Sequence, residues 1–149
     1  MRFQKISELR CSPEELFAFH ESPEALESLT PPWSGVRVLV PPRSLEVGTE
    51  VVVSVPLIGP LRRRWVARHT VYEPPHRFVD EQVSGPFASW VHEHRVEACP
   101  MGARLIDTVE YEPPGWLLSS LVDRLAVRRT LERTFEYRHA VTRRALEGA

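Results

Sequence analysis

The sequence predicts an α+β fold in which a long C-terminal helix covers one face of an antiparallel sheet. Three patterns in the 149 residues support this prediction. Apolar and polar residues alternate in six runs between residues 36 and 112, as they do in half-buried strands. Two helix-start signals precede these runs, and a helical period follows them from Trp116 to about Leu146. Short connections between the runs favour antiparallel pairing.

The N-terminal segment predicts one strand followed by two short helices. Residues 2–10 alternate weakly, which indicates an opening strand. Ser12 before Pro13 is typical of a helix N-terminus, because a serine side chain caps free backbone N–H groups and proline suits the first helical position. The same signal recurs at Ser22 and Pro23, so we expect Ser22 to cap a second helix.

Six further strands are expected after these helices, and proline doublets separate several of the segments. The strands are predicted over residues 36–40, 50–57, 61–73, 77–83, 87–98 and 103–112. The doublets, at residues 31–32, 41–42, 74–75 and 113–114, fall between periodic segments, where proline interrupts regular structure. Nothing in the composition indicates a second unit, so we expect a single domain over residues 1–149.

The C-terminal helical segment carries two apolar stripes that point in different directions. The first consists of Leu118, Leu121, Val122 and Leu125, and the second of Val127, Leu131 and Phe135, which Arg138 continues. One straight helix on one core does not need both stripes. We expect the second stripe to grip the sheet, and the first to form a separate turn or short helix with Trp116, as a lid or a dimer contact.

Composition and charge narrow the class of protein. A formal net charge of −1 gives no general attraction to nucleic acid. No apolar run is long enough for a membrane span, and the first residues resemble no secretory signal. Cys11 and Cys99 form neither a disulfide framework nor a zinc motif. We therefore expect a cytoplasmic protein with no nucleic-acid partner and no integral association with a membrane.

Two histidines occur two residues apart in the strand predicted over residues 87–98. Alternation places Trp90, His92 and His94 on one face, which is the apolar one. If the next turn pairs residue 98 with residue 103, His94 lies opposite Asp107, and Asp107 also points inward. The same parity in the strand over residues 61–73 turns Trp65 and His69 inward. Histidines and a carboxylate are thus expected inside the sheet.

Four stretches resemble the helix-grip superfamily of START, birch-pollen-allergen and polyketide cyclase/dehydrase-like proteins (SRPBCC proteins), in particular its small bacterial single-domain branch. They read "LTPPW" at 29–33, "EPPHRFVDEQVSGPFASWVHEH" at 73–94, "DTVEYEPP" at 107–114 and "FEYR" at 135–138. The resemblance implies a curved sheet of about seven strands around the C-terminal helix and an elongated cavity. Members bind lipids, sterols, quinones, plant hormones or aromatic polyketides, and some catalyse cyclisation or dehydration. Related domains occur fused to sugar-nucleotide epimerase-like proteins.

The inward histidines fit three hypotheses that the residues alone leave open. They form a structural His–Asp pair, or the polar end of a ligand cavity, or a metal site completed by His69 or Asp107. The superfamily is not usually metal-dependent, so we expect no metal and no cofactor. Arg138 either pairs with an inward carboxylate, Asp107 or Glu81, or recognises an anionic ligand group.

These observations favour a carrier or sensor of a hydrophobic, lipid-like or aromatic small molecule, and a homodimer is a possible assembly. The expected ligand-binding residues are Trp65, His69, Trp90, His92, His94, Asp107, Tyr111, Leu131, Phe135 and Arg138. One alternative is a cyclase, dehydratase or isomerase that uses His94 as a general base oriented by Asp107. Another alternative is a non-catalytic module that partners an enzyme. In that case this chain would dock through its arginines at 62–64 and 128–129.

Overall fold

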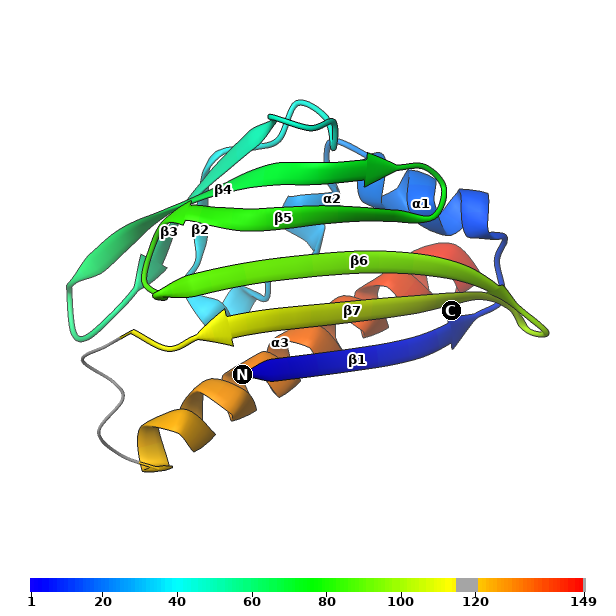
Figure 1. The fold of residues 1–149 in the computed structure, drawn as a ribbon. Helices are drawn as coiled ribbons and strands as arrows, with labels where there is room; N and C mark the ends of the chain where they lie inside the picture. Colours follow the sequence, from blue (N-terminus) through cyan, green and yellow to red (C-terminus); the bar gives the residue numbers. More distant parts are fainter. Residues whose placement is uncertain (115–120, 149) are drawn as a thin grey trace.

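The computed structural model describes residues 1–114 and 121–148 and confirms the predicted α+β architecture (Figure 1). Seven strands form one antiparallel sheet in the order β1-β7-β6-β5-β4-β3-β2. The strands are β1 (Arg2–Leu9), β2 (Arg37–Val40), β3 (Glu50–Pro56), β4 (Arg62–Glu73), β5 (Arg77–Ser84), β6 (Ser89–Cys99) and β7 (Gly102–Glu112). The helices are α1 (Pro13–Glu21), α2 (Ala25–Ser28), the 3₁₀ helix η1 (Pro32–Ser34) and α3 (Leu121–Glu147).

The expected start of α1 is confirmed, whereas the expected cap of the second helix is wrong. The Ser12 side chain accepts a hydrogen bond from the Glu15 backbone N–H, and the Glu15 carboxylate accepts one from the Ser12 N–H. Ser22 instead ends α1, because its hydroxyl donates back to the Phe19 carbonyl at 2.8 Å. Helix α2 begins two residues later than expected, at Ala25 instead of Pro23. Ser22 caps the C-terminus of α1 because the last carbonyl groups of a helix have no partner within the helix, and one of them, that of Phe19, lies close to the Ser22 hydroxyl.

The pairing of β6 with β7 agrees with the pairing counted from the sequence. Ala98 pairs with Ala103 and His94 with Asp107, as the counted turn predicts. A bulge in β4 shifts the register between His69 and Val71. Tyr72 rather than Val71 therefore lies on the inner side, where its ring is 6.1 Å from that of Phe17 in α1.

Helix α3 lies along the inner face of the sheet and contacts β1 and α1 (Figure 1). The second apolar stripe is buried as expected: Phe135 is 1% exposed, and its ring meets that of His92 at 5.0 Å, nearly perpendicular. Leu121 and Leu125 are 72% and 49% exposed on the same continuous helix, so they do not form the separate short helix that we expected. Trp116 and Leu118 lie outside the described residues.

The interior is divided into two hydrophobic clusters. One contains Leu9, Cys11, Leu16, Phe17, Leu45, Phe78, Val96, Ala103 and Leu105, where α1 packs on the sheet. The other contains Phe3, Trp90, Val109, Tyr111, Leu131 and Phe135, with Trp65, Phe87 and Val127 packed against it. Along β7, Asp107 falls between Leu105 of the first cluster and Val109 of the second. In the part of the chain that the structure describes, no helix has the length and apolarity to cross a membrane.

Truncation of Phe135 should destabilise the fold far more than changes in the exposed leucines. Phe135→Ala removes a fully buried ring and should lower the free energy of unfolding by about 3–5 kcal/mol. The double change Leu121→Ser, Leu125→Ser should cost less than about 1 kcal/mol, because both side chains already lie in water. Urea unfolding of the three proteins measures both effects. Equal losses would show that the exposed end of α3 is packed in solution.

Candidate functional site

A cluster of buried titratable side chains lies between the two hydrophobic clusters. Five of the six histidines of the chain belong to it, together with two aspartates. We call it the polar cluster, and its members are His20, His69, Asp80, His92, His94, Asp107 and His139, from α1, β4, β5, β6, β7 and α3. Every member is buried except Asp80, whose side chain is 19% exposed. Alternation in the strands and the apolar stripe of α3 direct these groups to the same place.

Asp107 is the centre of the polar cluster. Its Oδ1 accepts a hydrogen bond from His92 Nε2 at 2.9 Å, and its Oδ2 accepts one from His139 Nε2 at 2.7 Å. The other ring nitrogen of His139 lies 2.8 Å from Ser7 Oγ. Because Nε2 of His139 donates to the carboxylate, Nδ1 of a neutral His139 accepts from the serine hydroxyl. Helix α3 is thereby bonded to both β7 and β1 through one imidazole.

His94 lies between two carboxylates. Its Nδ1 is 2.9 Å from Asp107 Oδ1, an ionic contact whose direction does not meet the requirements of a hydrogen bond. Its Nε2 is 3.4 Å from Asp80 Oδ2, which is also 3.6 Å from His92 Nδ1. The ring of Phe78 stacks on that of His94, with centroids 4.0 Å apart. Both strand histidines therefore present one nitrogen to Asp107 and the other to Asp80.

The two carboxylates determine which histidine is charged. Burial by itself lowers the pKa of His94, but Asp107 and Asp80 outweigh it and raise this pKa to about 9. Burial together with the charge on His94 lowers the pKa of His92. Burial raises the pKa of Asp107, and His94, His139 and His92 lower it well below its ordinary value. At neutral pH His94 is thus an imidazolium and Asp107 a carboxylate.

The histidines at the edge of the polar cluster are neutral. Burial, reinforced by the charge on His94, lowers the pKa of His20 to about 4, and its Nδ1 donates to the Leu16 carbonyl at 3.0 Å. Burial also lowers the pKa of His69, whose Nδ1 lies 3.2 Å from the Thr49 carbonyl oxygen. Both rings are held by backbone groups and contribute no charge.

Arg138 points into the same interior without a carboxylate partner among the described residues. Its Nε donates to the Leu29 carbonyl at 3.2 Å, and its guanidinium carbon lies 5.3 Å from the centre of the Phe135 ring. Burial lowers its pKa, against the opposite effect of Asp107 and Asp80. The expected ion pair with Asp107 or Glu81 is not formed; Glu81 follows Asp80 in β5 and lies on the opposite face of the sheet.

Aromatic side chains cover the second hydrophobic cluster next to the polar cluster. Trp65 and Trp90 meet edge to face at 4.9 Å, and Phe87 lies 4.9 Å from Trp90 and 5.8 Å from Tyr111. We call Trp65, Phe87, Trp90 and Tyr111 the aromatic end. Trp65 Nε1 and the Tyr111 hydroxyl oxygen are buried there, and neither has a hydrogen-bond partner among the described residues.

The sequence prediction missed three members of the polar cluster. Asp80 follows the apolar residue Phe78 by two positions in β5, so strand alternation could have predicted that Asp80 points inward. His139 follows Phe135 by four residues, so the buried stripe continues to His139 and Thr142. His20 follows Leu16 by four residues in α1 in the same way. Helical spacing could have identified both histidines, but not the hydrogen bond of His139 to Asp107.

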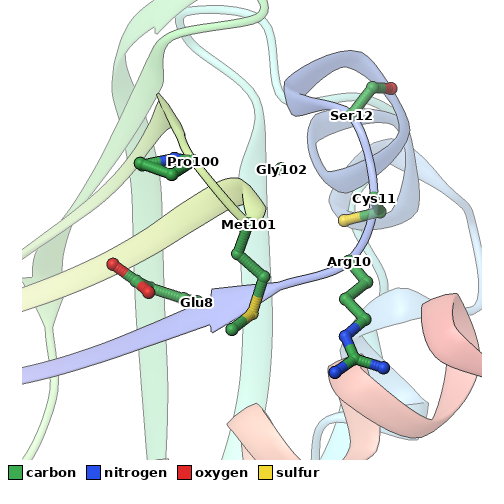
Figure 2. Close-up of a pocket in the computed structure, with 7 residues that line it drawn as sticks. All are labelled: Glu8, Arg10, Cys11, Ser12, Pro100, Met101 and Gly102. Atoms are coloured by element: carbon green, nitrogen blue, oxygen red, sulfur yellow. The ribbon is translucent and has the colours of Figure 1, made fainter.

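One open depression lies away from this site. It has a volume of about 860 Å³ and is formed where the β6–β7 turn meets the end of β1 and the start of α1 (Figure 2). Its lining residues are Glu8, Arg10, Cys11, Ser12, Pro100, Met101 and Gly102. None of the expected ligand-binding residues belongs to this set, so the depression does not serve the polar cluster or the aromatic end.

Two arginines expected to form a docking surface are engaged within the chain. Arg62 donates to the Ser54 hydroxyl and to the Gly35 carbonyl, at 2.8 and 2.6 Å. Arg128 donates to the Arg2 carbonyl at 3.1 Å and lies 3.3 Å from the Glu132 carboxylate. These contacts leave less of the expected basic surface available for a partner.

Comparison with known proteins gives a family and a fold. Residues 9–136 match the family model described as polyketide cyclase / dehydrase and lipid transport. No curated protein matches the chain by sequence. A solved protein of Rhodobacter sphaeroides is similar over 99% of this chain and 92% of its own, with 19% identity and a TM-score of 0.70. A solved protein of Thermus thermophilus is similar over 99% and 98%, with 16% identity and a TM-score of 0.73.

A third similar structure is a much longer protein. The nucleoside-diphosphate sugar epimerase of Corynebacterium glutamicum matches 97% of this chain, with 21% identity and a TM-score of 0.75. The match covers only 29% of the epimerase chain. At these identities the three structures show a shared fold.

The charge on His94 should make the stability of the fold depend on pH. A folded-state pKa of about 9 lies above the unfolded value of 6.5, so the stabilisation is complete below pH 6.5 and is lost as the pH rises through 9. The free energy of unfolding should therefore fall over this interval, and His94→Gln should remove that fall. Urea unfolding in metal-free buffer measures it, with His76→Gln as a control outside the polar cluster. A slope unchanged in His94→Gln would contradict the assignment.

Neutralisation of Asp107 should be among the most damaging single changes. Asp107→Asn leaves a buried imidazolium at His94 facing one carboxylate instead of two, and it disturbs the hydrogen bonds to His92 and His139. Loss of a buried ionic partner costs about 3–5 kcal/mol. Glu110→Gln, in the same strand on the exposed face, should change the free energy of unfolding by less than about 0.5 kcal/mol. A similar small effect for both would show that Asp107 does not hold the cluster together.

Proposed function

The chain belongs to the polyketide cyclase/dehydrase and lipid transport family, and from that premise we propose that residues 1–149 form one unit that carries or senses an apolar small molecule held between the sheet and α3. The family description supports a small-molecule ligand. The residues proposed to contact it are Trp65, His69, Trp90, His92, His94, Asp107, Tyr111, Leu131, Phe135 and Arg138. Phe87 joins them, because it contacts Trp65, Trp90 and Tyr111.

The observation that carries this proposal is the pair of unpartnered polar atoms at the aromatic end. Buried polar groups in folded proteins nearly always have a hydrogen-bond partner, and a group left without one costs about 1–3 kcal/mol. Trp65 Nε1 and the Tyr111 hydroxyl both lack a partner among the described residues, and both side chains contact Phe87. A ligand that bonds to these two atoms would remove the cost.

The chemistry of the two atoms limits the ligand. An indole N–H only donates, and a phenol both donates and accepts. The ligand should therefore carry an oxygen acceptor, such as a carbonyl, hydroxyl or carboxylate, on a body that packs against aromatic rings. Arg138 would suit a carboxylate, since its guanidinium faces the interior without an ionic partner among the described residues. A fatty acid and a flat aromatic ketone or quinone both meet this description.

Catalysis is the second candidate, favoured by the position of His94 between Asp80 and Asp107. The sequence suggested a general base, but a pKa of about 9 makes His94 a proton donor at neutral pH. A dehydration or cyclisation that needs a proton on a leaving hydroxyl or a carbonyl oxygen suits such a group. This candidate requires that a substrate reach His94 past the Phe78 ring.

Removal of the unpartnered hydroxyl should weaken ligand binding without weakening the fold. Tyr111→Phe deletes one oxygen, so the free energy of unfolding should stay within about 1 kcal/mol of the parent or rise. The affinity for an oxygen-bearing ligand should fall about tenfold, the equivalent of one hydrogen bond. Trp65→Phe should reduce affinity in the same direction. Tryptophan fluorescence titrated with oleate and with a naphthoquinone measures binding, and urea unfolding measures stability.

Tyr72→Phe is the matched control for the hydroxyl. The Tyr72 hydroxyl donates to the Glu21 carboxylate in the other hydrophobic region, so its loss should leave ligand affinity unchanged. Trp33→Phe, at a tryptophan that is 45% exposed, controls for the fluorescence change. Binding of neither probe, together with an empty mass spectrum of the purified native protein, would contradict the proposal. So would a Tyr111→Phe variant that loses stability and keeps its affinity.

A further inference from the structure

Three ligating atoms of the polar cluster converge on one point on the inner face of the sheet. An oxygen of Asp80 and one ring nitrogen from each of His92 and His94 all lie within 4.8 Å of one another. We propose that these three side chains form a binding site for a divalent transition-metal ion of the Zn²⁺ type. The site shares His92 and His94 with the residues proposed to contact the organic ligand, but it does not involve the unpartnered atoms of Trp65 and Tyr111 at the aromatic end.

The distances fit tetrahedral coordination without rearrangement of the backbone. Nitrogen and oxygen ligands bind Zn²⁺ at about 2.0–2.2 Å, so two ligands of a tetrahedral ion lie about 3.4 Å apart. Asp80 Oδ2 lies 3.4 Å from His94 Nε2 and 3.6 Å from His92 Nδ1. The two imidazole nitrogens lie within 4.8 Å of each other, so only the imidazole rings need to move for this third distance to fit an ion.

The sheet itself holds the three ligands in place. Asp80 of β5 pairs directly with His92 of β6, and His94 follows two residues later on the same face. Directly opposed side chains on one face of a sheet lie about 5 Å apart at Cβ, which suits ligands of one ion. Two imidazoles and one carboxylate form a donor set found in zinc and non-haem iron sites.

A second carboxylate supports the two histidines from behind. His92 Nε2 and His94 Nδ1, the nitrogens that point away from Asp80, both lie 2.9 Å from Asp107 Oδ1. Metal-binding histidines commonly present their remote N–H to a carboxylate, which orients the ring and strengthens its basicity. His139 and Ser7 in turn fix Asp107. Asp107 thus supplies this outer hydrogen bond to His92 and an ionic contact to His94.

The local charge favours a cation at this point. The ion would displace the proton of His94, and with both imidazoles neutral the formal charges of Asp80, Asp107 and Arg138 sum to −1. The guanidinium group of Arg138 donates to the Leu29 carbonyl and lies over Phe135. Three protein ligands leave a fourth position on a tetrahedral ion, where a water molecule or an anionic group could bind.

The geometry also corrects the third ligand suggested by the sequence. The sequence suggested His69 or Asp107 as the third metal ligand beside His92 and His94, and neither residue directs an atom to the point between these histidines and Asp80. His69 directs Nδ1 to the Thr49 carbonyl, and Asp107 lies on the far side of both imidazoles. Asp80 occupies the near side.

Calorimetric titration of the chelator-treated full chain with Zn²⁺ alone tests the site. One ion should bind per chain, with micromolar or tighter affinity. Asp80→Asn should weaken binding about 100-fold, and Asp107→Asn about 10- to 100-fold. Glu81→Gln is the matched control, because it neutralises the next carboxylate in the strand on the opposite face, and its affinity should equal that of the parent chain. Zn²⁺ binding that is absent, or equally strong in Asp80→Asn, overturns the proposal.

A second measurement keeps the test decisive if Asp80→Asn fails to fold. Crystals of the parent chain grown with Zn²⁺ should show an anomalous-scattering peak about 2.1 Å from each of the three ligating atoms. A peak only at surface histidine His76, or no peak, overturns the proposal. Neither experiment involves the organic ligand, so failure at the aromatic end and failure at the metal site are distinguishable.

Discussion

A buried carboxylate with three imidazoles around it is the interaction on which the rest of this structure depends. Isolation of Asp107 from water would cost several kcal/mol if it stood alone, and the cost is offset by two hydrogen bonds and a close imidazolium. Its partners come from β6 and from α3, so the same group fixes the inner face of the sheet and the position of the long helix. Removal of any one partner leaves the others with an uncompensated polar group.

The polar cluster separates two apolar regions with different properties. Where α1 packs on the sheet, side chains such as Leu9, Leu16 and Phe17 are fully buried, as in an ordinary protein core. The region around Trp90 and Tyr111 is also apolar but holds polar atoms with no partner among the described residues. Packing accounts for the first region by itself, whereas the second has hydrogen-bonding capacity that a ligand of suitable chemistry would use. This difference is the reason for proposing a binding surface in the second region.

Asp80 gives the cluster a second negative group on the other side of the histidines. A histidine between two carboxylates can hold a proton, as the raised pKa of His94 indicates, or give up that proton to a metal ion. Both states place positive charge between the same two carboxylates, and both need the rigid spacing that adjacent antiparallel strands provide. At the proposed site a proton and a metal ion would therefore compete for the same position.

Local patterns in the sequence were sufficient for the order of the strands and long helix along the chain and for the inward faces of β6 and β7. The pairing of His94 with Asp107 followed from counting across one tight turn, because side chains in a strand alternate with a fixed period. The buried stripe of α3 was equally readable, since helical spacing brings Phe135 onto the sheet. Ser22 was assigned to the wrong helix, because a cap can serve either neighbour and the choice depends on which backbone groups lie nearby. Only the tertiary structure decided that His139 bonds to Asp107 and that Asp80 faces His92 and His94. Those contacts join residues far apart in the chain, and their distances depend on how the helix docks and how β5 pairs with β6, which no local periodicity specifies.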